Sequence, residues 1–174
     1  MKSDETLMKQ FQRGDDDAFS ELVERYQQKL FNYFIRHLND YDRAEDLTQD
    51  LFIRVYRYGH SFDCEQRFRP WVYKIARNIL RKELKSEQDG KRLKAKILYG
   101  YQPFLNPDYE IIYAVREAIN KLPQAQKEVI ILKEYQGMTF AEIAEVLGCP
   151  ESTVKTRLYK ALKRLRKKLK RFRR

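Results

Sequence analysis

The chain has 174 residues, of which 35% are charged and 43% hydrophobic, and its formal net charge is +11 at pH 7. This length allows one domain or two small ones, and the apolar content excludes an intrinsically disordered chain. The chain contains only 6 Gly and 5 Pro, which favours helices over strands and turns, and its positive charge favours a polyanionic partner.

Two helices are predicted in the first 38 residues. Residues 4–12 carry apolar side chains on one side, and Gly14 interrupts that pattern. The aspartates at 15–17 then supply negative charge at the start of a helix expected over 17–38, where the helix dipole favours acidic side chains. The apolar stripe of this second helix is broad enough to indicate a core element. Its members are Phe19, Leu22, Val23, Tyr26, Leu30, Tyr33 and Phe34.

A third helix is expected over 42–57, with Asp40 or Asp42 as its cap. Its core-facing residues by spacing are Ala44, Leu47, Leu51, Val55 and Tyr58. The opposite face mixes acidic and polar side chains with apolar ones: Glu45, Asp46, Gln49, Asp50, Phe52, Ile53, Arg54 and Tyr56. This mixture fits a protein-binding surface and, equally, a helix that is buried on two sides.

After Gly59, a polar loop at 61–67 precedes a fourth helix expected over 68–85, with Pro70 in its first turn. Spacing places seven residues on its buried side: Phe68, Trp71, Val72, Ile75, Ala76, Ile79 and Leu80. The other side carries Lys74, Arg77, Asn78, Arg81, Lys82 and Lys85. Cations beside aromatic side chains and a polar loop suit single-stranded nucleic acid, which binds through base stacking and phosphate contacts. A solvated basic face above a core tryptophan explains the same pattern.

The helical pattern weakens from Ser86 to Asp108, where glycines, prolines and polar residues indicate an interdomain linker. Helical periodicity resumes near Asp108, a corner follows at Leu122 and Pro123, and another helix is expected over 124–136. The first helix of this second block has the apolar series Ile111, Ile112, Val115, Ala118, Ile119 and Leu122.

Residues 138–162 predict two helices joined by a tight turn. Thr139 and Glu142 have the spacing of a capping box, Gly148 suits a left-handed helix end, and Ser152 is the expected cap of the second helix. The expected apolar stripe of that helix is Val154, Leu158, Ala161, Leu162 and Leu165. Its outward side chains are Lys155, Thr156, Tyr159, Lys160, Lys163 and Arg164. The arrangement is typical of a helix-turn-helix, whose second helix enters the DNA major groove, although an ordinary helical hairpin has a similar pattern.

The whole charge excess lies at the C-terminal end. Residues 151–174 contain 12 Lys or Arg and one Glu, whereas the other 150 residues contain 24 basic and 24 acidic side chains. Polyanion binding is therefore expected on the second helix of the turn and on the segment after it. The alternative is a basic tail that only increases solubility.

No catalytic constellation is visible, so the sequence does not predict an enzyme. The chain contains no glycine-rich phosphate loop, Gly-x-Ser-x-Gly motif or His-Glu-x-x-His motif. His37 and His60 have no partner at metal-ligand spacing, and Cys64 and Cys149 lie far apart, so we expect no metal, no cofactor and no disulfide. No stretch has the apolar core of a signal peptide or the about 20 apolar residues that cross a bilayer, which predicts a soluble, cytoplasmic protein.

Four stretches together resemble the extracytoplasmic-function (ECF) group of bacterial RNA polymerase sigma factors. They are AEDLTQDLFIRVY (44–56), FRPWVYKIARN (68–78), LPQAQKEVII (122–131) and GMTFAEIA (137–144), in the order and spacing of that family. The resemblance covers nearly the whole chain and implies an all-α fold of two small helical domains joined by a flexible linker. Residues 1–86 would form the N-terminal domain, 87–107 the linker and 108–174 the helix-turn-helix domain.

The resemblance also implies roles by position in the first domain. Core RNA polymerase would be the main partner, through its beta subunit and the coiled coil of its beta-prime subunit. The residues implied for polymerase binding are Asp46, Gln49, Asp50, Phe52, Arg54 and Tyr56. The 61–67 loop and the helix after it would open the minus-ten element of a promoter and hold a flipped, unpaired base. The residues implied there are Phe62, Asp63, Arg67, Trp71, Lys74, Arg77, Asn78 and Arg81.

In the second domain, the same resemblance implies that the helix after the turn reads the minus-thirty-five element in the major groove. The residues implied are Ser152, Thr153, Lys155, Thr156, Arg157, Tyr159, Lys160 and Lys163. Glu151 departs from the small, uncharged residues that many relatives have there, and its charge would repel a phosphate near that helix start. The other implied partner is an anti-sigma factor, which in this family is often membrane-anchored.

Two other classes of protein remain open from the sequence. One is a free-standing regulator resembling the response-regulator type, which shares the Thr-Val-Lys-Thr-Arg of 153–157. Such a protein would bind duplex DNA as a dimer and would not need the acidic helix at 42–57. The other class is an adaptor with a basic tail and no specific DNA target.

Overall fold

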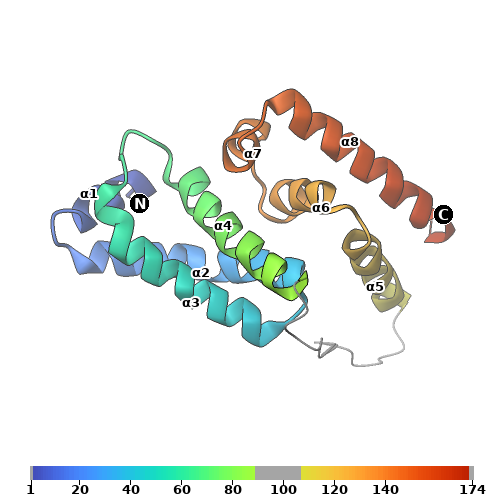
Figure 1. The fold of residues 1–174 in the computed structure, drawn as a ribbon, viewed down its shortest axis with the longest axis horizontal. Coiled ribbons are helices and arrows are strands. Elements are labelled where there is room, and N and C mark those ends of the chain that lie inside the picture. The colour runs from blue at the N-terminus through green and yellow to red at the C-terminus, as the bar shows by residue number, and fades with distance from the viewer. Residues whose placement is uncertain (1, 89–106, 173–174) are drawn as a thin grey trace. The chain divides into compact units, whose positions relative to one another are not determined.

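The computed structural model describes residues 2–88 and 107–172, and these ranges contain helices and turns but no strand (Figure 1). The chain divides into two compact units, one containing α1 to α4 and the other α5 to α8. The all-helical fold expected from the sequence is therefore confirmed. The predicted linker at 87–107 falls almost wholly outside the described residues, so the domain boundaries remain a prediction.

Four α-helices form the described part of the first unit. They are α1 (Asp4–Phe11), α2 (Asp16–Leu38), α3 (Tyr41–Tyr58) and α4 (Phe68–Gln88), with a short 3-10 turn, η1 (Gly59–Ser61), after α3. In Figure 1, α2 and α3 run side by side in opposite directions, and α4 contacts both. Packing of their apolar faces buries five aromatic side chains almost completely: Phe11, Tyr33, Phe34, Phe68 and Tyr73.

Short polar side chains fix the starts of the first three helices. Ser3, Asp15 and Asp40 each accept a hydrogen bond from a backbone N–H three residues later, at 3.2, 3.2 and 3.1 Å. Each bond satisfies an N–H that has no partner inside its helix. α2 ends at Asn39, whose φ of 59° reverses the chain into α3. The α2–α3 hairpin therefore follows from the two residues Asn39 and Asp40.

The second unit is built around the last long helix. Its elements are α5 (Pro107–Asn120), α6 (Gln124–Ile130), a π-helical turn η2 (Ile131–Tyr135), α7 (Phe140–Leu147), α8 (Glu151–Lys168) and a 3-10 turn η3 (Lys170–Phe172). α8 contacts α5, α6 and α7. The core of the second unit includes Ile119, Leu122, Ile130 and Ala161. The half-buried side chains of Val115, Leu158 and Leu165 pack against these four residues.

The local signals of the helix-turn-helix are confirmed, except for one cap. Glu142 donates its N–H to Thr139 Oγ1 at 3.2 Å and accepts the N–H of Thr139 on Oε2 at 2.7 Å, which completes the capping box. Gly148 ends α7 with a φ of 64°. The prediction that Ser152 caps α8 is wrong, because the helix already begins at Glu151 behind Pro150. Proline suits this position because its fixed φ leads into a helix and its missing N–H leaves no unpaired donor.

Four residues of the predicted apolar patterns are exposed, and Tyr73 and Thr48, which belong to none of those patterns, are buried. The exposed ones are Tyr58 at 63%, Ile111 at 43%, Ile112 at 62% and Leu162 at 46%. Tyr58 is the last residue of α3, and the two isoleucines lie in the first turns of α5, where fewer described neighbours can cover a side chain. The buried ones are Tyr73, whose ring lies 5.6 Å from that of Tyr33, and Thr48.

Within 2–88 and 107–172, no helix combines the length and the apolar character that a membrane span requires. In the same residues, no three His, Cys, Asp or Glu side chains come together in a way that could hold a metal ion. His37 is buried, and its ring lies 4.8 Å from that of Tyr33, which fits a structural role.

Candidate functional sites

The exposed face of α3 combines polar and apolar side chains. Asp46 and Gln49 are exposed, and Asp50 beside them is half-buried. Arg54 Nε donates to both carboxylate oxygens of Asp50, at 3.1 and 3.0 Å, and this pair one helical turn apart fixes both side chains along the surface. Ile53, one turn after Gln49 and Asp50, is 53% exposed. The face is therefore amphipathic, as a protein-binding surface requires.

Tyr56 connects this face to the start of α2. Its ring lies 5.3 Å from the ring of Phe11 and 5.2 Å from that of Phe19, and its hydroxyl donates to Asp16 Oδ1 at 3.4 Å. Tyr56 is 48% exposed despite these contacts. Phe52 is half-buried and, by helical spacing, lies at the flank of the face. The structure thus brings the predicted polymerase-binding residues onto one side of α3, with Phe52 at its edge.

The loop after η1 turns its aromatic residue inward and its polar residues outward. Phe62 is only 5% exposed, and its ring lies 4.7 Å from that of Trp71 and 5.9 Å from that of Phe68. Asp63 accepts the N–H of Glu65 at 3.0 Å, a hydrogen bond that stabilises a tight turn. Asp63 and Arg67 are exposed. A ligand can reach these two residues, whereas Phe62 supports the loop from inside.

One face of α4 continues from this loop. Four predicted residues recur on it every three or four positions: Trp71, Lys74, Asn78 and Arg81. Arg77 lies at the edge of this face by the same spacing. Trp71 is half-buried and held between Phe62 and Phe68, whereas Arg81 is exposed. An aromatic ring fixed beside cations can stack on an unpaired base and bind the phosphates that follow it.

α8 directs a polar and basic face outward. Besides Lys155, five predicted residues are exposed along it: Ser152, Thr156, Tyr159, Lys160 and Lys163. The aromatic side chain of Tyr159 is 69% exposed. Thr153 and Arg157 are half-buried, and Arg157 Nη1 donates to Cys149 Sγ at 4.0 Å. Arg157 is therefore engaged with the turn, whereas the five exposed residues are accessible to a ligand.

Lys155 stands beside the start of this outward face. Its Nζ lies 3.8 Å from Glu151 Oε2 and 5.4 Å from the centroid of the Phe140 ring. Both members of the ion pair are about half exposed, so the attraction between them is weak in water. The Lys155 charge still opposes that of Glu151 and reduces the repulsion that Glu151 would exert on a phosphate at this helix start.

Two sets of residues at these sites were not among the predicted site residues. The sequence could have indicated Ile53, because its spacing places it on the same face of α3 as the acidic residues. Glu5, Lys9 and Gln12 contact the loop or the start of α4 from the first helix of the chain. No sequence pattern could indicate these contacts, because the partners lie about 50 to 60 residues apart and follow no period.

Both units match models of one protein family. The model described as Sigma-70 region 2 matches residues 22–89, and the model described as Sigma-70, region 4 matches residues 112–165. The first match covers most of α2 and all of α3 and α4, and the second runs from α5 into α8. Each candidate DNA-binding face therefore lies within a matched region.

Similar proteins extend the match to nearly the whole chain. The ECF RNA polymerase sigma factor SigW of Bacillus subtilis is 32% identical over 176 residues, covering 93% of this chain and 94% of SigW. The RNA polymerase sigma-H factor of Pseudomonas aeruginosa is 30% identical over 182 residues, with coverages of 97% and 94%.

Two solved structures have a similar fold, each at 25% sequence identity. One is CnrH in complex with the cytosolic domain of CnrY, with a TM-score of 0.77 and coverages of 97% of this chain and 98% of that chain. The other is the sigma factor RpoE in complex with the anti-sigma factor NepR from Bartonella quintana, with a TM-score of 0.72 and coverages of 87% and 96%. The chain described here belongs to the ECF group of the sigma-70 family of RNA polymerase sigma factors.

Proposed function

We propose that this chain binds core RNA polymerase, directs it to a bipartite promoter and helps to open the minus-ten element. The observation that supports this proposal best is the presence of two chemically different exposed faces, one on each of two separate units, that suit nucleic acid. In the first unit, the ring of Trp71 is fixed beside cations on α4. In the second unit, a helix-turn-helix directs Lys160 and Lys163 outward. The first face suits unpaired DNA, and the second suits the major groove of a duplex.

The α3 face is the proposed contact with core polymerase. Ile53 supplies an exposed apolar anchor, and Asp46, Gln49 and the Asp50–Arg54 pair supply a polar rim, an arrangement common in protein interfaces. Ile53 therefore joins the six residues predicted from the sequence. The coiled coil of the beta-prime subunit is the proposed partner of this face, and the beta subunit makes further contacts with the factor. The chemistry of RNA synthesis then belongs to the polymerase.

The 62–67 loop and α4 are the proposed minus-ten site. Asp63 and Arg67 can form hydrogen bonds with the edge of a flipped base, and Trp71 can stack on a neighbouring base. The cations Lys74, Arg77 and Arg81 would hold the phosphates of the unpaired strand. In this proposal Phe62 does not contact DNA, because its ring is buried against Trp71.

α8 is the proposed reader of the minus-thirty-five element. Thr156, Tyr159 and Lys160 occupy the exposed face that would enter the major groove, and lysine can donate to the O6 and N7 acceptors of guanine. Ser152, Thr153, Lys155 and Lys163 would contact phosphates and set the register of the helix on the duplex. Arg157 would act indirectly, by holding the turn through its contact with Cys149.

An anti-sigma factor is the other proposed partner. The structures of CnrH and RpoE that this fold resembles were solved as complexes, the second with the anti-sigma factor NepR. Such a partner would prevent transcription by covering the polymerase-binding or DNA-binding faces. A free-standing regulator is not favoured, because the Sigma-70 region 2 match occupies residues 22–89, which such a protein would not need.

Capture of core polymerase tests the proposal at its first step. Asp46→Arg combined with Gln49→Ala should reduce capture by at least about tenfold, because it reverses the charge on the α3 face. Glu24→Arg, which reverses an exposed charge on α2, is the matched control and should bind like the wild type. Undiminished capture by the Asp46→Arg, Gln49→Ala variant would exclude the α3 face as the polymerase contact.

A further inference from the structure

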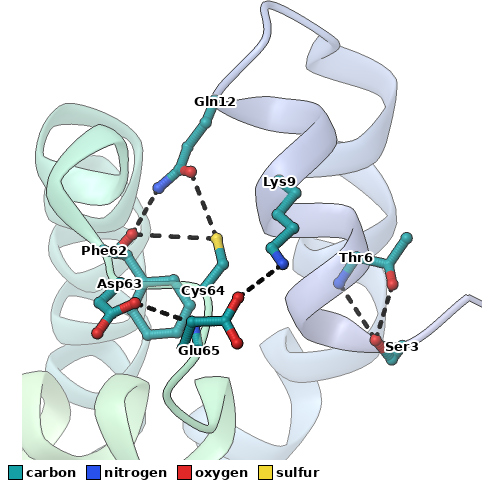
Figure 2. Close-up of polar contacts among 8 residues, drawn as sticks. All are labelled: Ser3, Thr6, Lys9, Gln12, Phe62, Asp63, Cys64 and Glu65. Atoms are coloured by element: carbon teal, nitrogen blue, oxygen red, sulfur yellow. Dashed lines mark hydrogen bonds and ion pairs between the residues drawn. The ribbon is translucent and has the colours of Figure 1, made fainter.

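The 62–67 loop is tied to α1, a helix that contributes none of the proposed DNA contacts (Figure 2). Gln12, the residue directly after α1, uses both polar atoms of its side-chain amide. Its Nε2 donates to the carbonyl oxygens of Phe62 at 2.7 Å and Gly59 at 2.9 Å, and its Oε1 accepts a hydrogen bond from the Cys64 thiol at 3.3 Å. One side chain therefore bridges the backbone before the loop and two residues inside it.

Two further contacts connect α1 to the far part of the loop. Glu5 Oε1 accepts the backbone N–H of Phe68, the first residue of α4, at 3.0 Å. Because the first N–H groups of a helix have no partner within it, this bond fixes the point where the loop ends. Lys9 Nζ lies 3.0 Å from Glu65 Oε1, but both side chains are largely exposed, so this ion pair contributes little in water. α1 thus holds the loop at its beginning and at its end.

Close packing beside the loop leaves its backbone little freedom. A Cβ at Gly59 would lie 2.9 Å from Phe11 Cε1 and 3.2 Å from Met8 Cε, so η1 rests directly on α1. Burial raises the pKa of the Cys64 thiol, which therefore remains protonated and can donate to Gln12 at neutral pH. Loss of the Gln12 amide would remove a donor from each of two carbonyls. The Gly59 oxygen would keep only the backbone N–H of Phe62, at 3.0 Å, and the Phe62 oxygen only the long contact with the Cys64 thiol, at 4.0 Å, which favours a rearranged loop.

The side of the loop that is turned away from these contacts presents its polar residues to solvent. Asp63, Gln66 and Arg67 are exposed, and Asp63 is held by its own hydrogen bond with Glu65 N. A loop that is already ordered loses less conformational entropy when it binds a ligand, and its side chains meet the ligand in a defined geometry.

We propose that Gln12 is a positioning residue for promoter opening, which holds the 62–67 loop in the conformation that captures the unpaired base. Gln12 does so without contact with DNA. The inference rests on the proposed function of the loop, and it extends the promoter-reading apparatus to α1. The ligand is an unpaired nucleotide of the minus-ten element.

Hydrogen exchange in the full chain tests whether Gln12 holds the loop. Gln12→Met keeps the length and packing of the side chain but removes its donors and acceptor. Amide exchange over 59–68 should accelerate by about tenfold or more, whereas exchange in α2 should not change. Gln27→Met, at an exposed position of α2, is the matched control and should leave both segments unchanged. Unchanged exchange over 59–68 in Gln12→Met would overturn the inference, whatever the loop does with DNA.

Promoter opening tests whether this support matters for base capture. A promoter selected with the wild-type holoenzyme is prepared with one abasic nucleotide at each position of its downstream element. We expect a single position at which the missing base lowers open-complex formation by about tenfold or more with the wild type. With Gln12→Met this penalty should fall to about threefold or less, and the preference at the upstream element should be unchanged.

The outcomes of these two experiments separate the inference from the proposed function. If Gln12→Met retains the full abasic penalty, Gln12 does not position the loop for capture. If the wild type shows no penalty at any position, base capture by the loop is wrong and the positioning role falls with it. Hydrogen exchange still reports independently whether Gln12 holds the loop.

Discussion

The two units support their candidate DNA-binding faces in different ways. In the first unit, the loop is held by hydrogen bonds from Gln12 and Glu5, and Trp71 is packed between two phenylalanine rings. In the second unit, α8 packs through buried Val154 and Ala161, and its cations extend from the opposite side into solvent. A pocket for one unpaired base needs a fixed shape. Binding to a duplex depends mainly on positive charge and on side chains long enough to contact the phosphates. The first unit should therefore be sensitive to geometry and the second to salt.

The largest expected effect separates the two faces by the form of DNA that they bind. Lys74→Ala with Arg81→Ala should weaken binding of the holoenzyme to a single-stranded downstream oligonucleotide by about tenfold to a hundredfold. The slope of log affinity against log salt should fall by about 1.4, since each phosphate contact on a single strand contributes about 0.7. Affinity for the duplex upstream element should not change. Salt titrations with the two DNA forms provide the measurement.

The converse pair of substitutions lies in α8. Lys160→Ala with Lys163→Ala should weaken binding to the duplex upstream element. The salt slope should fall by about 0.9, the contribution of one phosphate contact on duplex DNA, because Lys163 is the proposed phosphate contact and Lys160 the proposed base reader. Binding to the single strand should be unaffected. If both variants weaken both DNA forms equally, the two faces are not specialised as proposed.

Alkaline pH should affect the stability of the two units in opposite directions. Lys127 in α6 is 7% exposed, and burial, together with the charge of Arg116, lowers its pKa to about 8. Between that value and the ordinary 10.5, the unfolded state binds more protons than the folded state, so the second unit should gain about 2–3 kcal/mol as pH rises. In the first unit, burial raises the pKa of Tyr26 and Tyr73 above the ordinary 10.0. Their stabilising contribution is complete below pH 10 and is lost as pH rises above it.

Denaturant unfolding at pH 7.5, 9 and 10.5 measures this difference. Fluorescence of Trp71, the single tryptophan, reports the first unit, and circular dichroism reports both units. Lys127→Met should abolish the gain of the second unit between pH 8 and 10.5. If that gain persists in Lys127→Met, Lys127 is not its source.

Two glycines, one in each unit, should differ in what an added methyl group costs. Gly59→Ala should destabilise the first unit by about 1–3 kcal/mol, because its Cβ would press on Phe11 although the backbone φ of −61° is ordinary. Gly148→Ala meets no atom within 4 Å but must adopt a φ of 64°, which costs about 1 kcal/mol. Equilibrium unfolding of both variants tests the order. A larger loss of unfolding free energy in Gly148→Ala than in Gly59→Ala would mean that α1 can shift to make room for a methyl group at Gly59.

The smallest expected effect concerns Lys9. Lys9→Ala removes an exposed ion pair with Glu65, so hydrogen exchange over 59–68 should not change measurably. Gln12→Met, measured in the same experiment, should accelerate it. Equal acceleration by both variants would show that the exposed ion pair holds the loop as strongly as the half-buried amide of Gln12 does, which contradicts the ranking.

Local features of the fold were predictable from the sequence because their physical causes are local. The capping box of Thr139 and Glu142 and the left-handed Gly148 depend on residues within a few positions of each other. The periodic apolar residues Leu7, Met8 and Phe11 are buried as expected. These features were sufficient to locate the helices and the helix-turn-helix.

The errors arise where packing depends on distant parts of the chain. Periodicity identifies the side of a helix but does not show how far its packing partner extends, which is why Tyr58 and Ile111 at helix ends are exposed. The family resemblance implied Phe62 among the residues at the DNA, and the sequence did not indicate that its ring is buried against Trp71 and Phe68. The contacts of Gln12 join segments about 50 residues apart and give no sequence signal.

Selection from a randomised promoter library by the wild-type holoenzyme, followed by probing for unpaired bases, tests most directly whether the two units read two forms of DNA. We expect two enriched sequence blocks at a fixed separation, with unpaired bases confined to the downstream block. Enrichment of a single block or of a palindromic pair, no enrichment at all, or unpaired bases in the upstream block would contradict the assignment.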